Sequence, residues 1–396
     1  MRKIAILIFG CLCGFFMGCE DKNIDWQPGT DSIAPDTISI INVENLPGAA
    51  KITYNLPNDK DLVLVEAVYT IDGKKQRTSA SVYTNSLTVY GFGSTDAQTI
   101  QLYSVDRSGN YSQGVNVVIN PLTPPVISIF ESIKMGPSFG GVSLRWDNPS
   151  ESNVSLWLLV KDSTGIHKEV ETIYTSASSG QFKLRGFEAK KELFGVYVRD
   201  RWNNLSDTLF AELTPLYEEK IDSKFFKRLS LPRDEDDAGQ FSRMFDGNIA
   251  VGMYTSVAVS LSPVFFTIDL GQPVMLSRYI LWHRQSNPYN NCSPKLWKVY
   301  GTLNPDFSNS DTNYWVNGYQ KDWELLSDVN NISQYKPSGD DLQNTSEDLA
   351  AALAGFDIEC TNETPVRYLR FEITENWAMP VRTVIGELEF YGAPQE

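Results

Sequence analysis

The strongest constraint on the fold is an internal repeat in the first half of the chain. Three stretches recur in the same order, with an offset of about 92–95 residues: Gly48–Pro57 with Gly140–Pro149, Gly91–Phe92 with Gly186–Phe187, and Val105–Ser112 with Val198–Ser206. An offset of this size is that of a domain rather than of a solenoid unit. The first half of the chain is therefore expected to contain two related domains.

Both copies have the sequence pattern of β-structure. Runs rich in β-branched and aromatic residues, such as Leu62–Tyr69, are followed by turn residues, and Asp72–Gly73 is a hairpin signal. Short strands at regular spacing over about 100 residues predict an immunoglobulin-like or fibronectin type III-like sandwich. We assign the two sandwiches to residues 35–121 and 122–217. Their endings share the pattern D-x-x-x-N-x-S, with a small slip in the preceding valine, and the ending V-x-D-x-x-x-N-x-S is typical of the last hairpin of fibronectin type III-like domains.

Between the copies lies Pro121–Pro125, which predicts a short, stiff linker because proline fixes φ and removes backbone donors. Three tryptophans of the second copy, Trp146, Trp157 and Trp202, are interpreted as core or edge aromatics rather than ligand platforms. On this interpretation the two sandwiches act as spacers.

The N-terminus has the pattern of a targeting segment. Arg2 and Lys3 precede an apolar stretch, Ile4–Met17, which is too short to span a membrane and suits a signal peptide. Gly18–Cys19 resembles a bacterial lipobox, although Phe16 stands where leucine is usual. We therefore expect a lipoprotein signal peptide at 1–18, lipidation of Cys19 and a tether at 19–34. A plain secretory signal is the alternative.

Acidic residues follow Cys19 directly, and Glu20–Asp21 resembles the surface-export signal of Bacteroidetes lipoproteins. This resemblance implies an outer-membrane protein that is anchored by lipid and faces the medium. Cys292 and Cys360 remain in the mature chain, where a disulfide and two free thiols are both open.

Composition argues against several classes of function. The net charge of −15 opposes binding to nucleic acid. The 396 residues contain only two histidines, which disfavours most metal-hydrolase and Ser/His/Asp schemes. No segment has the size and strand–helix alternation of a glycosidase barrel. We therefore expect a protein that is not an enzyme.

The C-terminal part, residues 222–396, shows the period of β-strands. In Val264–Leu270, the residues Val264, Phe266, Ile268 and Leu270 are expected to face inward, and they alternate with Phe265, Thr267 and Asp269. Further strands are expected at Arg278–Arg284, Leu296–Gly301, Trp323–Leu326, Arg367–Ile373 and Gly386–Tyr391. Thr345 as N-cap, good helix formers over Leu349–Ala354 and Gly355 as C-cap predict one short helix. The charge run Arg233–Asp237 is interpreted as a solvated loop.

Six motifs in this part resemble discoidin, or coagulation factor 5/8 type C, domains. They are F-D-G-N, F-x-I-D-L-G, I-L-W-H-R, P-K-L-W-K-V-Y-G-T, V-R-Y-L-R-F-E-I and I-G-E-L-E-F-Y-G. The resemblance covers about residues 225–396 and implies a galactose-binding-like β-sandwich, or jelly roll, of carbohydrate-binding module family 32 type. The expected fold class is therefore all-β, with two fibronectin type III-like sandwiches followed by this domain and its one inserted helix.

The whole layout resembles Bacteroidetes surface lipoproteins with two fibronectin-like domains of unknown function, which are associated with starch-utilisation-like glycan uptake loci. The resemblance implies a cell-surface glycan-binding lipoprotein that works with an outer-membrane transporter or other glycan-binding proteins. The alternative is a protein-interaction or adhesion module in an outer-membrane complex or on host glycoprotein.

The resemblance also implies a sugar site on loops at one end of the last domain. Arg284 and Asn290 match the positions that hydrogen-bond ring hydroxyls, and Trp377 matches the aromatic that stacks on the sugar. His283 and Tyr289 flank the same loop. Alternatives stay open: an ion pair for Arg284, a core position for Trp377 and a packing role for His283.

Many domains of this type hold a structural Ca²⁺. Asp246, Asn248 and Glu387 match its ligand positions, whereas Val251 stands where a threonine is usual. The alternative is that Asp246 caps a tight turn and Gly247 supplies backbone freedom.

Overall fold

The computed structural model describes residues 31–161, 165–237, 240–250, 254–255, 262–290, 292–339, 343–378 and 382–395. It divides into two compact units, which are residues 31–129, 150–154 and 198–207 on one side and the remaining described residues on the other. The predicted signal peptide and Cys19 lie outside the described residues, as do Val251 and most of the tether. Within those ranges, no helix has the length and apolar character needed to cross a membrane.

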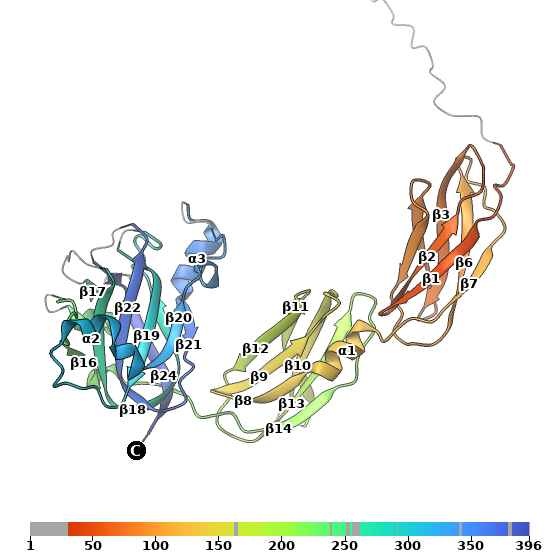
Figure 1. Cartoon of the computed structure of the whole chain (residues 1–396). Helices are drawn as coiled ribbons and strands as arrows, with labels where there is room; N and C mark the ends of the chain where they lie inside the picture. The colour runs from red at the N-terminus through yellow and green to blue at the C-terminus, as the bar shows by residue number, and fades with distance from the viewer. Residues whose placement is uncertain are drawn as a thin grey trace, which may run out of the picture. The chain divides into compact units, whose positions relative to one another are not determined.

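The first sandwich has one three-stranded and one four-stranded antiparallel sheet (Figure 1). The strands of the first sheet, in the order β1-β2-β5, are β1 (Ser39–Leu46), β2 (Ala49–Asn55) and β5 (Ser86–Tyr90). Those of the second, in the order β4-β3-β6-β7, are β3 (Leu62–Ile71), β4 (Lys74–Ser81), β6 (Gln98–Asp106) and β7 (Val115–Ile119). Asp72 and Gly73 both have positive φ, 48° and 74°, which confirms the predicted hairpin turn.

The second sandwich repeats this plan. One sheet, in the order β12-β9-β8, contains β8 (Lys134–Ser138), β9 (Gly141–Asp147) and β12 (Ser179–Arg185). The other, in the order β11-β10-β13-β14, contains β10 (Val154–Lys161), β11 (His167–Thr175), β13 (Glu192–Asp200) and β14 (Leu209–Leu213). Helix α1 (Pro125–Ser132) was not predicted. Its first residue is the last proline of the predicted linker, because proline lacks the N–H that would be unsatisfied at a helix start.

The repeated sequence pattern corresponds to a repeated hydrogen-bond arrangement. The carboxylate of Asp106 accepts bonds from the backbone N and the side-chain Nδ2 of Asn110, at 2.8 and 2.9 Å. Asp200 accepts the same two bonds from Asn204, at 3.0 and 2.8 Å. In each copy the pair closes the turn after a core strand, which explains why aspartate and asparagine recur at this spacing.

The C-terminal domain is a sandwich whose two layers are joined by one long strand, β18 (Val264–Trp282). Its first part, Val264–Asp269, pairs with β22 (Val366–Asn376), and its second part, Val274–Trp282, pairs with β24 (Glu387–Pro394). These three strands belong to one eight-stranded sheet. Its other strands are β15 (Glu219–Lys220), β16 (Lys227–Leu229), β19 (Pro294–Thr302), β20 (Glu324–Val329) and β21 (Phe356–Glu359). A separate two-stranded sheet consists of β17 (Tyr254–Thr255) and β23 (Val384–Ile385). The two strands predicted on either side of Gly271 are thus one strand with an irregularity there.

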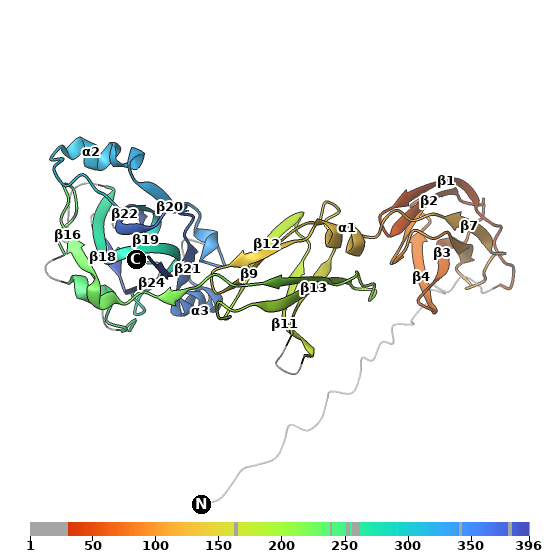
Figure 2. The same ribbon diagram turned by 90° about the horizontal axis from the view of Figure 1, so that it is seen from below.

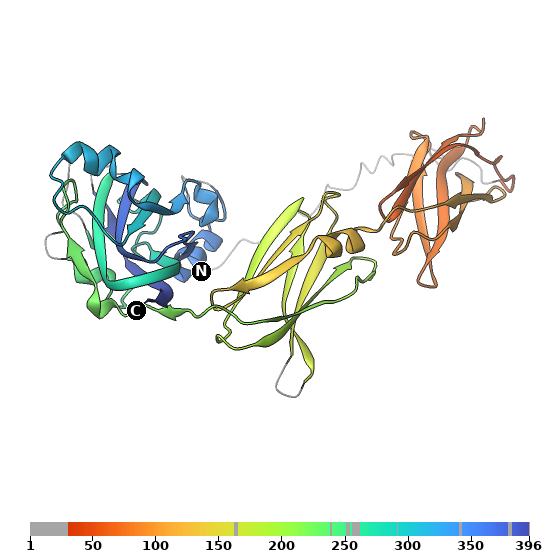
Figure 3. The same cartoon turned by 60° about the horizontal axis from the view of Figure 1, so that its bottom comes forward.

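Two helices accompany this sandwich, and the three views place them on opposite sides of it (Figure 1, Figure 2 and Figure 3). Helix α3 (Ser346–Ala354) confirms the predicted helix: Thr345 is its N-cap, a capping box joins Thr345 and Asp348, and Gly355 ends it with φ 85°. Helix α2 (Thr312–Asn317) was not predicted. The all-β fold class is confirmed.

The outer face of the first part of β18 is buried, contrary to the simple alternation that the sequence predicted. Phe265 and Thr267 are 0% and 1% exposed. A second aromatic cluster covers this face, formed by Leu231, Phe265, Tyr300, Trp315, Tyr319 and Trp323. Period-2 alternation fixes which residues share a face, but it does not show that another segment packs on the polar one.

The charge run predicted as a solvated loop is also largely buried, so that prediction was wrong. Asp234 pairs with Arg370, and the two side chains are 1% and 0% exposed. Glu235 and Asp237 are 5% and 3% exposed. The reason is that Arg370 on β22, which is distant in the sequence, forms an ion pair with Asp234 and neutralises its carboxylate. Cys292 and Cys360 are free thiols, so the disulfide alternative is excluded.

Candidate functional site

The predicted sugar site is built on two loops of the C-terminal domain. Residues 283–293 connect β18 to β19, and residues 377–383 connect β22 to β23. Backbone hydrogen bonds join the loops, from Trp377 N to Ser293 O at 3.1 Å and from Val384 N to Cys292 O at 2.9 Å. Asn291 and residues 379–381 lie outside the described residues. The described parts of both loops are therefore held to one another by the main chain.

His283 is fully buried at the base of the first loop. Its Nε2 lies 2.8 Å from Pro294 O, and its Nδ1 lies 3.2 Å from the backbone N of Tyr289. Nε2–H thus donates to the carbonyl while Nδ1 accepts, which fixes a neutral ring. Burial lowers the pKa of His283 to about 3. With no exposed surface, His283 cannot contact a sugar, so its inclusion in the sugar site was wrong and the packing alternative describes it.

Tyr289 is also buried, with 5% exposure, and its hydroxyl donates to Tyr335 O at 2.8 Å. Burial raises the pKa of its phenol. The residue packs edge-to-face against Trp377, with ring centroids 5.5 Å apart. Its φ of 53° turns the chain back over His283. Tyr289 therefore shapes the loop from inside, and little of it is available to a ligand.

Trp377 is partly buried and packs against the main core of the domain. Two ammonium groups lie near its ring, with Lys336 Nζ 5.0 Å and Lys295 Nζ 5.3 Å from the centroid. Its indole nitrogen is buried and has no hydrogen-bond partner. The ring is therefore engaged on several sides, and only part of it is open to solvent.

Arg284 and Asn290, the other two predicted sugar-site residues, both reach solvent. Asn290 is exposed, and its Nδ2 donates to Asn287 Oδ1 at 3.2 Å. Arg284 is half-buried, and its Nε is buried without a hydrogen-bond partner. Among the described residues no carboxylate lies within ion-pair distance of Arg284, so the ion-pair alternative has no support there.

The second loop brings a further cation to this place, which the sequence motifs did not include. Arg382 is half-buried. The carbonyl of Arg382 accepts a hydrogen bond from Asn376 Nδ2 at 2.8 Å, which anchors its backbone. Its position in the same loop as Trp377 was the available signal.

The turn that carries the predicted cation ligands Asp246 and Asn248 contacts the third, Glu387, through Gly247. Its Oε1 accepts the backbone N–H of Gly247 at 3.0 Å, while its Oε2 is buried with no hydrogen-bond partner. Burial and the nearby charge of Asp246 raise the pKa of Glu387 to about 7. An orphaned carboxylate oxygen beside a second carboxylate fits a bound cation in its donor chemistry.

The remaining predicted ligand, Asn248, lies in the same turn. Its Oδ1 accepts the N–H of Ala250 at 3.2 Å, and its own N–H donates to Asp246 Oδ1 at 2.9 Å. Gly247 has φ 75°, so the alternative of a glycine-dependent turn capped by Asp246 also describes the local backbone. The two descriptions are compatible, because the turn leaves Glu387 Oε2 unsatisfied.

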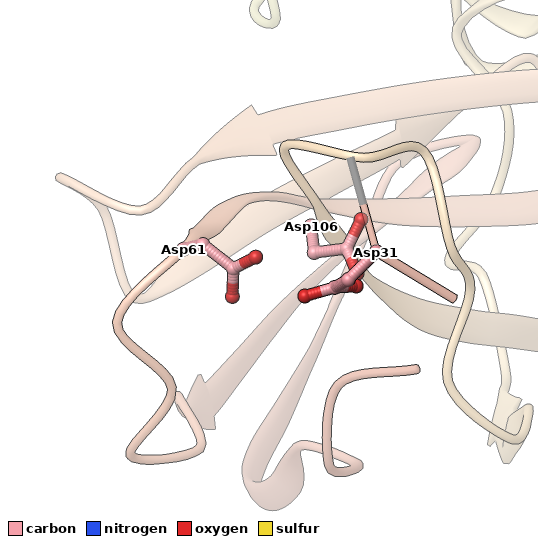
Figure 4. A group of neighbouring side chains, drawn as sticks. All are labelled: Asp31, Asp61 and Asp106. Carbon is pink, nitrogen blue, oxygen red and sulfur yellow. The ribbon is translucent and has the colours of Figure 1, made fainter. Parts of the chain in front are cut away.

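A second group of carboxylates lies in the first sandwich, where Asp31, Asp61 and Asp106 place one oxygen each within 4.8 Å of the others (Figure 4). The side-chain nitrogen of Asn110 donates to Asp31 Oδ1 at 3.2 Å and to Asp106 Oδ2 at 2.9 Å. These bonds account for the proximity of two of the acids, and we assign no metal to the group.

Family models of three domains of unknown function match the chain. The domain named DUF4959 matches residues 35–121, DUF5126 matches 122–224 and DUF5000 matches 244–392. A comparison with curated protein sequences finds no match.

Among solved structures, the chain is similar to a protein named "SusE-like protein BT2857". The identity is 32%, and the alignment covers 69% of this chain and 100% of that one, with a TM-score of 0.42. The chain belongs to the family of SusE-like proteins.

This SusE-like chain is also similar to two further solved structures. One is the module CBM32-3 of a family 31 glycoside hydrolase from Clostridium perfringens, at 19% identity over 44% of this chain and 94% of that one, with a TM-score of 0.31. The other is a two-domain fibronectin type III segment of chicken tenascin, at 16% identity over 46% and 99%, with a TM-score of 0.22. At these identities we draw no conclusion about ligands.

Proposed function

We propose that this SusE-like protein binds glycan at Arg284, Asn290 and Trp377, in support of a glycan uptake system. The observation that carries the proposal is Arg284: a half-buried guanidinium with a buried, unsatisfied Nε and no ion pair among the described residues. A buried donor without a partner costs about 1–3 kcal/mol, so such a group is best explained by a ligand that completes its bonds. The hydroxyl groups of a sugar are suitable acceptors.

The site supports binding rather than hydrolysis. Its one histidine, His283, is buried and neutral, so it cannot exchange a proton with a substrate. Asn290 and the open part of Trp377 would add a directed bond and a contact with the sugar ring. We further propose lipidation of Cys19 and an outer-membrane location facing the medium, with an outer-membrane transporter as partner.

The test is glycan binding by the unlipidated chain without residues 1–19. We expect Arg284→Ala to weaken binding at least tenfold, because a hydrogen bond to a charged group contributes about 1.5–3 kcal/mol. Thermal unfolding should be unchanged, because the guanidinium makes no hydrogen bond or ion pair with the described residues that would hold the fold. Titration calorimetry against a glycan panel measures the effect.

The matched control is Arg107→Ala, an exposed arginine of the first sandwich. It should bind as the wild type does. Equal affinities for wild type and Arg284→Ala would refute the site, and turnover of aryl-glycosides would refute a purely binding role. Binding of an outer-membrane protein but of no glycan would favour the interaction-module alternative.

We also propose that Asp246 and Glu387 hold a structural Ca²⁺, with Asn248 contributing to the same turn. Calcium at 100 times its Kd should stabilise the folded domain by about 2.7 kcal/mol, which raises its Tm by roughly 5–10 °C. Glu387→Gln should remove this increment, because the amide supplies no second anionic oxygen. Differential scanning calorimetry with calcium and with chelator measures it.

The control for the calcium site is Glu389→Gln, two residues further along β24. Glu389 is partly exposed and already paired with Lys220 at 2.6 Å, so this variant should keep the full response to calcium. A Tm that does not respond to calcium in the wild type would show that the turn holds no cation.

A further inference from the structure

We propose that the ligand is an acidic glycan, and that Arg284 and Arg382 together bind the carboxylate of a uronic acid residue. This inference rests on the proposed glycan-binding function and specifies its substrate class. The two guanidinium groups come from the two loops that the main chain joins. Arginine presents a planar fork of donors that matches a carboxylate in two parallel hydrogen bonds.

Arg284 and Arg382 differ from the other half-buried or buried arginines of this domain because they form no ion pair with the described residues. Other half-buried or buried arginines in the described part of residues 222–396 lie within ion-pair distance of a carboxylate: Arg228, Arg233, Arg278, Arg367 and Arg370. No ion pair of Arg284 or Arg382 is found among the described residues. The chain has 49 acidic and 34 basic residues, so carboxylates are plentiful. Leaving two arginines unpaired together points to an anion that the protein does not supply.

Arg284 and Arg382 belong to two loops that main-chain hydrogen bonds hold together. Cys292 lies between the loops, with 7% exposure, and its carbonyl accepts the N–H of Val384. Burial raises the pKa of its thiol, and the charges of Arg382 and Arg284 both oppose that rise. The main chain also brings the two residues together: Gly386 N donates to Trp282 O at 2.8 Å and Val384 N donates to Cys292 O at 2.9 Å, so Arg284 and Arg382 each lie two residues from one of these bonds.

The other charged groups near these loops already have partners. Lys295 pairs with Glu375 at 2.8 Å, and Lys336, which is 1% exposed, donates to Gln343 O at 3.0 Å. Asp348 accepts the N–H groups of Ser338 and Thr345 at 2.9 and 2.8 Å. Lys336 is buried beside the rings of Tyr289 and Trp377, so the partly exposed cations at these loops without an ion pair among the described residues are the two arginines.

This arrangement distinguishes acidic from neutral sugars. Hydroxyl groups can accept hydrogen bonds from Arg284, but they leave two like charges close together and uncompensated. A carboxylate both accepts the bonds and neutralises the repulsion, and partial burial limits screening by solvent. Affinity for the acidic sugar should accordingly fall as salt rises, whereas affinity for a neutral one should not.

The experiment compares three probes by calorimetry on the unlipidated chain: a galacturonic acid oligosaccharide, a neutral galactose oligosaccharide and a sulfated galactose oligosaccharide. We expect the uronate to bind at least tenfold more tightly than the neutral probe, with a loss of affinity between 50 and 500 mM salt. Arg382→Gln should weaken uronate binding at least tenfold and so bring it close to the affinity for the neutral probe. Arg243→Gln, an exposed arginine of the same domain, is the control and should change neither.

The outcomes separate this inference from the proposed function. Equal binding of uronate and neutral probe, insensitive to Arg382→Gln, would overturn the inference and leave glycan binding standing. Preference for the sulfated probe over the uronate would overturn the carboxylate assignment. Failure of every glycan in a wider panel would overturn the proposed function itself. Thermal unfolding of both variants should match the wild type, and a loss of Tm in Arg382→Gln would assign the residue to the fold instead.

Discussion

Arg370→Met is expected to lower the free energy of unfolding of the C-terminal domain by about 3–5 kcal/mol, the usual cost of removing one partner of a buried ion pair. Arg370 is fully buried on β22, and Asp234, its partner, is 1% exposed. Methionine fills a similar volume but leaves the carboxylate without a cation. Burial already raises the pKa of Asp234, and the charge of Arg370 is the largest influence that opposes this rise.

The surroundings of Arg370 add to this cost. It donates to Thr267 Oγ1 at 3.0 Å and to the carbonyls of Trp315 and Pro232 at 3.2 and 3.3 Å. Three aromatic rings surround the guanidinium carbon, with the centroid of Phe265 at 4.7 Å. Arg370 thus joins the charge run and α2 to the face of β18, and its loss should loosen all three.

Denaturant unfolding of the C-terminal domain measures this effect, and two variants test its cause. Lys298→Met removes the cation of an exposed pair, 4.0 Å from Asp328, and should cost no more than about 1 kcal/mol. The double variant Asp234→Leu/Arg370→Met should be more stable than Arg370→Met alone, because it leaves no unpaired charge. Additive losses in the double variant would contradict the ion-pair explanation.

This pair also shows where prediction from sequence ends. The repeat, the strands and helix α3 follow from local signals: apolar periodicity, turn glycines and a capping box within a few residues. Asp234 and Arg370 lie 136 residues apart, so no local sequence pattern indicates that they form a pair. A run of five charged residues is solvated by default, and only the fold shows the cation that allows its burial.

The loop at the end of β18 shows that the candidate site, too, could be predicted only in part from the sequence. The motif I-L-W-H-R places His283 and Arg284 side by side, and both are plausible ligands for a sugar. The fold separates them: His283 turns into the core, whereas Arg284 keeps an unsatisfied nitrogen at the loops. Arg382 was missed because its significance depends on having no partner, which a sequence cannot show.

His283 should make the stability of the C-terminal domain fall in acid. Its pKa is about 3 in the folded domain and about 6.5 in an unfolded chain. A lowered folded pKa leaves stability intact above pH 6.5, and stability is then lost as pH falls toward 3 because only the unfolded chain takes up the proton. Between pH 7 and pH 4.5 this loss should reach about 2–3 kcal/mol. Protonation of Nδ1 would also break its bond from Tyr289 N, so acid should release the loop that carries Arg284.

Chemical denaturation at several pH values, compared with two variants, isolates this contribution. His283→Gln keeps a donor for Pro294 O but does not titrate, so wild type should lose about 2–3 kcal/mol more than this variant between pH 7 and pH 4.5. His167→Gln replaces the other histidine, which is exposed on β11, and should retain the acid sensitivity of the wild type. Parallel pH profiles for wild type and His283→Gln would mean that His283 is protonated in the folded domain. Since other buried acids titrate alike in both proteins, the difference between the two profiles belongs to His283 alone.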